Sequence, residues 1–281
     1  TIAGISNSAT AENSVALGGR NNKATEVGAV VLGGGSNDAE GYRAVAAGGD
    51  NNWAAGQESM ALGGTLNRAD GLRSVTVGGR SNTASGDDSV AIGGRGLVAS
   101  YTGSVAIGGL SNESSGQRSL ALGGSSNEAK GTDSVTLSGR ENESKGLIAV
   151  TISGMSNSAR GQNSILLGGK DNQTFASSDA GVIASNPEGG NGAVIITGGS
   201  NEARGARSVI VGGMHNITYA SGDIILGGME NSTKAQRAMV LNGDYNEAKG
   251  YEAVAIGGMS NDSTGRHSLT VGGYSNAAPA P

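Results

Sequence analysis

Apolar and polar positions follow one another in a unit of fifteen residues that recurs from one end of the chain to the other. Residues 13–27 read NSVALGGRNNKATEV, and residues 28–42 read GAVVLGGGSNDAEGY. With Asn13 as position 1, the consensus is x-[SA]-[VIL]-x-[LIV]-G-G-x-x-N-x-[AS]-x-G-x. Self-similarity at a short fixed period is typical of a solenoid, in which each unit contacts mainly its neighbours.

Each unit predicts two short strands and two turns. At positions 2 to 5 the larger apolar residues, at 3 and 5, share one face of an extended strand, and smaller residues, at 2 and 4, share the other. The Gly pair at 6 and 7 permits positive φ and a tight turn. Positions 10 to 13 form a second strand, and Gly at 14 turns the chain back. This pattern predicts an all-β fold, a flat parallel β-roll.

The charged residues divide the unit into inside and outside positions. Lys and Arg occur at positions 1, 8, 11, 13 and 15, and buried unpaired charge is unfavourable, so positions 3, 5, 10 and 12 are predicted to lie inside. The recurrent Asn at position 10 is expected to form a hydrogen-bonded ladder along the stack and to cap the adjacent turn. We expect the side chains of Val105, Ile107, Leu120 and Leu122 to be almost inaccessible to solvent. We expect those of Arg80, Lys130 and Arg160 to be exposed.

The face made by positions 2 and 4 needs a cover in this scheme. A symmetric oligomer along the stack is the simplest cover.

Composition excludes several classes. There are 52 Gly, aromatic residues are 3% of the chain, and no Cys is present, so disulfides and thiolate chemistry are excluded. The net charge is −5 with interspersed signs, so no basic stripe indicates nucleic acid. No apolar run is long enough to span a membrane, and no signal peptide is visible. We expect this to be an exported segment of a longer protein that ends in a linker, AAPAP.

The motif SVAIGG at 89–94 and 104–109, followed by N-x-[AS]-x-G, resembles the head repeats of trimeric autotransporter adhesins, the YadA-like heads. The resemblance implies a left-handed parallel β-roll, a homotrimer around a shared axis, and exposure at the bacterial cell surface with anchoring in the outer membrane through a region outside this chain. The period of fifteen departs from the fourteen that is frequent in that family, and no neck or stalk motif follows.

No motif for catalysis or cofactor binding is present. Lys170 follows a Gly pair without a phosphate-loop sequence, and neither a nucleophile motif nor a calcium-binding repeat occurs. The two histidines, His215 and His267, stand alone in the sequence, so a metal site is not expected. We expect a protein without enzymatic activity, cofactor or metal.

The breaks in the repeat are the candidate interaction sites. Position 10 is Leu97 in one unit, and Tyr101 replaces Gly at position 14 of the same unit. After Asn172 the Asn spacing falls to fourteen, at Asn186, before Asn201 continues the series. We interpret residues 1–276 as a single repeat domain, irregular at about 173–191, and 277–281 as a linker or chain end. Exposed aromatics are favoured binding anchors, so the candidate receptor-binding residues are Trp53, Leu97, Tyr101, Phe175 and Tyr219.

Three functions fit the repeat. The first is a non-enzymatic adhesin head that binds host cells or matrix proteins such as fibronectin, laminin or collagen through many equivalent surfaces. The second is a trimeric fibre segment of a phage or virus. The third is an ice- or polysaccharide-binding solenoid, although positions 8, 11 and 13 are too mixed for the single-residue file that ice binding needs.

Overall fold

Every regular element is a short β-strand in the computed structural model, which describes residues 4–175 and 192–279, and no helix occurs in those ranges. The all-β parallel solenoid predicted from the repeat is confirmed. The chain divides into two compact units, residues 1–133 and 134–281, and each is described by itself. That residues 1–276 form a single domain stays a prediction.

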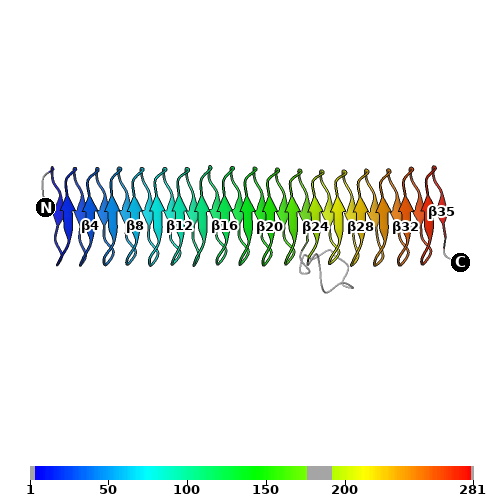
Figure 1. Ribbon diagram of the computed structural model, residues 1–281, viewed down its shortest axis with the longest axis horizontal. Helices are drawn as coiled ribbons and strands as arrows, with labels where there is room; N and C mark the ends of the chain where they lie inside the picture. The colour runs from blue at the N-terminus through cyan, green and yellow to red at the C-terminus, as the bar shows by residue number, and fades with distance from the viewer. Residues whose placement is uncertain (1–3, 176–191, 280–281) are drawn as a thin grey trace. The chain divides into compact units, whose positions relative to one another are not determined.

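Each turn of the solenoid, called a rung below, contains one three-residue strand at positions 3 to 5 and one two-residue strand at positions 11 and 12 (Figure 1). In the first unit the three-residue strands are β2 (Val15–Leu17), β4 (Val30–Leu32), β6 (Val45–Ala47), β8 (Met60–Leu62), β10 (Val75–Val77), β12 (Val90–Ile92), β14 (Val105–Ile107) and β16 (Leu120–Leu122). Its two-residue strands are β1 (Ser8–Ala9), β3 (Lys23–Ala24), β5 (Asp38–Ala39), β7 (Trp53–Ala54), β9 (Arg68–Ala69), β11 (Thr83–Ala84), β13 (Val98–Ala99), β15 (Glu113–Ser114) and β17 (Glu128–Ala129).

The second unit repeats the same rung. Its three-residue strands are β18 (Val135–Leu137), β20 (Val150–Ile152), β22 (Ile165–Leu167), β24 (Val194–Ile196), β26 (Val209–Val211), β28 (Ile224–Leu226), β30 (Met239–Leu241), β32 (Val254–Ile256) and β34 (Leu269–Val271). Its two-residue strands are β19 (Glu143–Ser144), β21 (Ser158–Ala159), β23 (Gln173–Thr174), β25 (Glu202–Ala203), β27 (Ile217–Thr218), β29 (Ser232–Thr233), β31 (Glu247–Ala248), β33 (Asp262–Ser263) and β35 (Ala277–Ala278).

Neighbouring rungs pair in parallel without any shift in register. Val15 of β2 pairs with Val30 of β4, and Lys23 of β3 pairs with Asp38 of β5. A third contact, which the repeat did not predict, is a one-residue bridge at position 8, as between Arg20 and Gly35. Each residue therefore contacts its own counterpart in the next rung, so that side chains of one position form a column.

The irregular interval between Asn172 and Asn201 breaks the sequence repeat, but the rungs on either side of it still pair with each other. β22 pairs directly with β24, and β23 with β25. The Asn201 N–H donates to the Oδ1 of Asn172 across 29 residues, where ordinary rungs span 15. The interval is therefore an insertion of 14 residues, 29 minus 15, and not the shortened unit predicted at Asn186. The roll continues in register on both sides, as predicted; residues 176–191 themselves, with Asn186 and Pro187, lie outside the described residues.

The interior of each unit consists of small side chains. Positions 2, 4, 10 and 12 point inward, and residues such as Ala16, Asn22 and Ala24 are fully buried. The prediction was right for positions 10 and 12 and wrong for positions 3 and 5: Val105, Ile107 and Leu120 are half-buried, and Leu122 is 39% exposed. The two strand layers of a rung leave room for Ala, Ser and Thr between them, and for a few larger residues such as Leu166 and Ile195 in the second unit. The larger residues at positions 3 and 5 therefore face outward.

Asn at position 10 joins each rung to the next. Asn37 is fully buried; its N–H donates to Asn22 Oδ1 at 3.0 Å, and its own Oδ1 accepts the N–H of Asn52 at 2.9 Å. Its Nδ2 donates to the carbonyls of Gly33 and Gly48, both at 3.1 Å. A ladder and the predicted turn cap are both present, and in the ladder a backbone N–H donates to the side-chain Oδ1 of the preceding rung.

The glycine at position 7 is required for a steric reason. Gly34 has φ +79°, and a Cβ placed there would lie 2.3 Å from the Gly49 carbonyl oxygen and 2.4 Å from Asn37 Nδ2. Position 6 also has positive φ, but at Gly33 a Cβ would meet nothing within 4 Å. Ser138 and Asn242 accordingly replace glycine at position 6.

Candidate interaction surface

Each unit presents an outward row of apolar side chains, called the apolar face below, formed by positions 3 and 5 of its three-residue strands. In the first unit Val15, Leu17 and Leu32 are 40–42% exposed; in the second, Leu226, Leu269 and Val271 are 42–63% exposed. Soluble monomers rarely leave contiguous apolar surface open to water. The apolar face is therefore suited to being covered by another chain.

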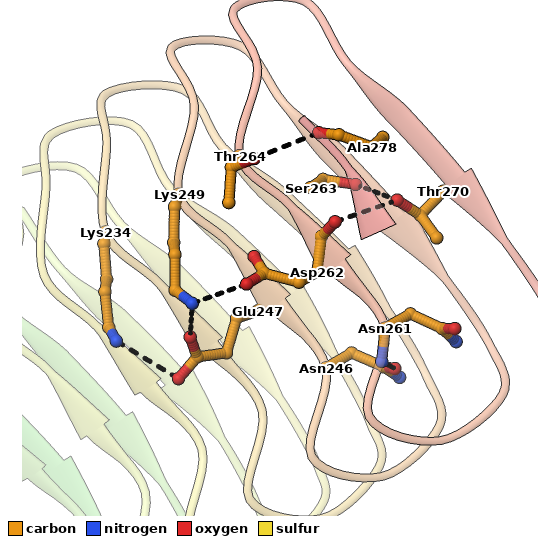
Figure 2. Close-up of polar contacts among 10 residues, drawn as sticks. All are labelled: Lys234, Asn246, Glu247, Lys249, Asn261, Asp262, Ser263, Thr264, Thr270 and Ala278. Atoms are coloured by element: carbon orange, nitrogen blue, oxygen red, sulfur yellow. Dashed lines mark hydrogen bonds and ion pairs between the residues drawn. The ribbon is translucent and has the colours of Figure 1, made fainter. Parts of the chain in front are cut away.

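The two-residue strands carry the opposite surface, called the polar face below and formed by the side chains at positions 11 and 13. In the second unit, Figure 2 shows a chain of ion pairs that crosses successive rungs on this face. Lys234 Nζ lies 3.1 Å from Glu247 Oε1, and Lys249 Nζ lies 2.6 Å from Asp262 Oδ2 while also contacting Glu247. The charges compensate one another locally.

These pairings shift the pKa values of Glu247 and Lys249. Burial alone would raise the pKa of Glu247, but hydrogen bonds from Lys249 and Lys234 outweigh it and lower that pKa below its usual value. Hydrogen bonds to Asp262 and Glu247 raise the pKa of Lys249. Glu247 and Lys249 therefore remain ionised near neutral pH.

Trp53, the first candidate anchor, is engaged within its own unit. Its Nε1 donates to Glu40 Oε2 at 3.0 Å, and the guanidinium carbon of Arg68 lies 4.3 Å from its ring centroid. A cation over an aromatic face is a favourable contact. The indole contributes to the polar face but has little free surface for a partner.

Phe175 and Tyr219 belong to one column at position 13 of the second unit. Arg204 lies between them, 5.3 Å from the Phe175 ring and 5.1 Å from the Tyr219 ring, and Arg160 lies 6.0 Å from Phe175. Cations and aromatic rings therefore alternate along this column. The sequence contains the signal, since these residues share position 13, but single-residue reasoning did not detect it.

Leu97 is not part of any surface. Its side chain is fully buried, in the column otherwise occupied by Asn, and its N–H donates to Asn82 Oδ1 at 2.9 Å. The prediction that Leu97 contacts a receptor is therefore wrong, because position 10 points inward in every rung described. Leu97 offers the next rung no side-chain oxygen.

Tyr101 is the most exposed of the candidates, at 58%. It lies beside a hollow of the first unit whose other lining residues are Thr102, Ser115, Gly116, Gln117, Lys130 and Thr132. Of the two residues that depart from the repeat in this rung, Leu97 thus points inward and Tyr101 lies at the surface.

Asp223 is a buried carboxylate that sequence reasoning missed. It occupies position 2, where the other described rungs have Ser or Ala, and it is fully buried. Its oxygens accept the N–H groups of Ala220 at 2.9 Å and Ala238 at 3.1 Å. Burial raises its pKa to about 7, against the opposing effect of the nearby Thr233 hydroxyl and these N–H groups. The sequence could have revealed this buried group, because Asp223 is the one carboxylate at position 2, where the other described rungs have Ser or Ala.

Within residues 4–175 and 192–279, no cluster of three or more His, Asp or Glu side chains could hold a metal ion. His267 is less solitary than the sequence implies, because its Nδ1 lies 3.1 Å from Glu252 and its ring packs edge-on against Tyr251. Over the same residues, no helix has the length and apolarity to cross a membrane.

Comparison with known proteins finds one family model that matches parts of the chain. The model of the YadA head domain repeat matches residues 3–21, 9–36 and 79–95. A search of curated proteins gave no match. The matched residues lie in the first unit, and the second unit is built from the same rung. The matched repeats and the parallel β-solenoid together support a YadA-like head domain.

Proposed function

We propose that the chain is the head of a trimeric autotransporter adhesin, exposed at the bacterial cell surface, which attaches to host cells or matrix without enzymatic activity. The family supports the surface exposure and the adhesin-like role. This proposal includes a left-handed winding of the roll and a fifteen-residue repeat as a variant of the family. It also includes assembly into a trimer and anchoring in the outer membrane through another part of the protein.

The apolar face is the observation that carries the proposal. Positions 3 and 5 carry Val, Ile, Leu or Met in nearly every rung, and none of them is charged. Burying such side chains contributes about 25 cal/mol per Å² of apolar surface. Three copies around a common axis would cover all three apolar faces and leave the polar faces outside.

Light scattering on the purified chain tests the assembly. We expect a trimer at micromolar concentration, and Ile107→Lys should weaken it because each trimer would then bury three ammonium groups. Thr83→Lys, on the polar face, is the matched control and should leave the mass unchanged. A monomeric native chain would contradict the proposed assembly.

Attachment is tested separately, with the trimer applied to immobilised fibronectin, laminin and collagen. Saturable binding to one of them, lost on dissociation by Ile107→Lys, is the expected result. A trimer that binds none of these proteins and no host cell would favour the alternative of a phage or viral fibre segment.

A further inference from the structure

Tyr101 occupies position 14, which is Gly or Ala in most of the other described rungs and Glu26 in one. Gly86 and Gly116 occupy the same position 14 in the adjacent rungs, and a Cβ at Gly86 would lie 2.2 Å from the backbone of Tyr101. The Gly116 N–H donates to both the Ala129 carbonyl and Ser119 Oγ, each at 3.0 Å, and the Tyr101 N–H donates to Ser104 Oγ at 3.1 Å. A large aromatic side chain at this position departs from the fold's own rule, and such departures concentrate at functional sites.

In the part of the chain that the structure describes, the ring of Tyr101 carries no guanidinium, unlike the rings of Trp53, Phe175 and Tyr219. A guanidinium lies over the rings of Trp53, Phe175 and Tyr219, and over those of Tyr42 and Tyr251. Among the residues that the structure describes, no such cation or second ring packs on Tyr101. Its 58% exposure is thus available to a ligand.

The groups around the ring are almost all uncharged. The hollow beside it offers the hydroxyls of Thr102, Ser115 and Thr132 and the amide of Gln117. The one cation, Lys130, is paired with Glu128. None of these residues belongs to the apolar face, so the hollow stays open if that face is covered.

We infer that the Tyr101 hollow is a saccharide subsite that takes an uncharged pyranose ring. This inference rests on the proposed adhesin function, of which it names the ligand class. A pyranose has an apolar C–H face, which can lie on the phenol ring, and a rim of hydroxyls, which matches donors and acceptors such as Ser, Thr and Gln. An anionic sugar would need an unpaired cation. A peptide anchor would need a deeper, desolvated pocket.

The probe is an immobilised array of neutral oligosaccharides of hexoses and N-acetylhexosamines, with heparin as the acidic comparison, applied to the full chain. We expect binding to neutral members of the array. Tyr101→Gly restores the residue of the adjacent rungs, so it should fold with an unchanged or higher melting temperature. It should weaken binding about tenfold, the equivalent of about 1.4 kcal/mol per site.

Two further variants test whether binding depends on the aromatic ring of Tyr101 in particular. Tyr101→Phe keeps the ring and should retain most of the binding. Tyr245→Ser removes a tyrosine that is 45% exposed in the second unit, at a position where Ser is common, and should retain all of it. Binding equal to that of the native chain in Tyr101→Gly, or binding to heparin alone, would overturn the inference.

The outcomes also distinguish this inference from the proposed function. If Tyr101→Gly abolishes attachment to a matrix protein stripped of glycans, the saccharide inference is wrong and the adhesin function stands. If Tyr101-dependent sugar binding is found but the trimer attaches to no host surface, the subsite stands and the host-attachment proposal fails.

Discussion

A buried Asn at position 10, such as Asn37, satisfies its polar groups with backbone groups of its own and neighbouring rungs. Buried polar groups are tolerated when they are hydrogen-bonded, and removing one partner leaves the others unsatisfied. Asn37 contributes an acceptor to Asn52 N–H and a donor to the turn carbonyls of Gly33 and Gly48. Leu97 shows that a side chain of similar size fits the same column without these bonds.

Asn37→Leu should therefore lower the free energy of unfolding by about 2 kcal/mol, the usual penalty for an unsatisfied buried donor and acceptors. Chemical denaturation of the purified chain measures it. The reverse change, Leu97→Asn, is the matched control and should leave stability unchanged or raise it, since it supplies an acceptor to Asn112. Equal stability of Asn37→Leu and the native chain would show that the ladder contributes little.

Asp223 makes the stability of the second unit depend on pH. Its pKa is raised from 3.8 to about 7 in the folded chain, so the stabilisation is complete below pH 3.8 and is lost as the pH rises through 7. We expect the native chain to be more stable at pH 5 than at pH 8, on the order of 2 kcal/mol. Asp223→Ser, which installs the common residue of this column, should remove that difference. A difference of the same size in both proteins would assign it to other groups.

At the scale of the elements, the strands and turns could be predicted from the sequence, but the inward face of the strand could not. Strand alternation, the Gly pair and the inward Asn follow from local chemistry. Both faces of the strand at positions 3 to 5 are apolar, so alternation alone does not orient it. The usual rule that larger residues lie inside failed at Val105 and Ile107, because the distance between the two strand layers limits the size of inward side chains.

The candidate site was predictable to a similar extent. Tyr101, where the sequence departs from the usual Gly, is 58% exposed, and its contact with a receptor stays a prediction. Leu97 was misassigned, although its column is the inward Asn column. The guanidinium contacts of Trp53 and Tyr219 join residues that are distant in sequence, so they required the register of the rungs.

The two turn glycines should respond differently to the same substitution. Gly33→Ala meets no neighbour, so only the positive φ is unfavourable, at about 1–2 kcal/mol. Gly34→Ala adds a collision with the Gly49 carbonyl and should cost at least about 3 kcal/mol or prevent folding. Thermal denaturation of the two variants gives the comparison. Similar melting temperatures would mean that the rungs can separate to admit a Cβ.

At the scale of the molecule, each unit is a stack in which a rung depends mainly on its two neighbours. The insertion after Phe175 shows that the second unit keeps its register when residues are added between rungs, because β22 and β24 still pair. Stability in such repeats is approximately a sum of rung and interface contributions. The register of the columns matters more than the length of the chain.

Removal of one whole rung should therefore be tolerated. Deleting residues 58–72 joins Gln57 to Arg73 and preserves every column, so we expect a folded chain whose melting temperature falls by only a few degrees. Deleting residues 58–71 instead shifts all later residues by one position and reverses the two strand faces. This control should fail to fold past the deletion, as circular dichroism and limited proteolysis would report. Equal behaviour of both deletions would contradict a register fixed by the columns.

The missing acceptor at Leu97 also has a mechanical consequence. Under the proposed adhesin function, drag on an attached cell would load the head, and a stack of similar layers yields first where two layers are joined least strongly. The Asn ladder of the first unit is interrupted between Leu97 and Asn112, beside the exposed Tyr101. A pulled head would then open at this place before its other rungs, lengthening under load while the remaining layers keep their grip.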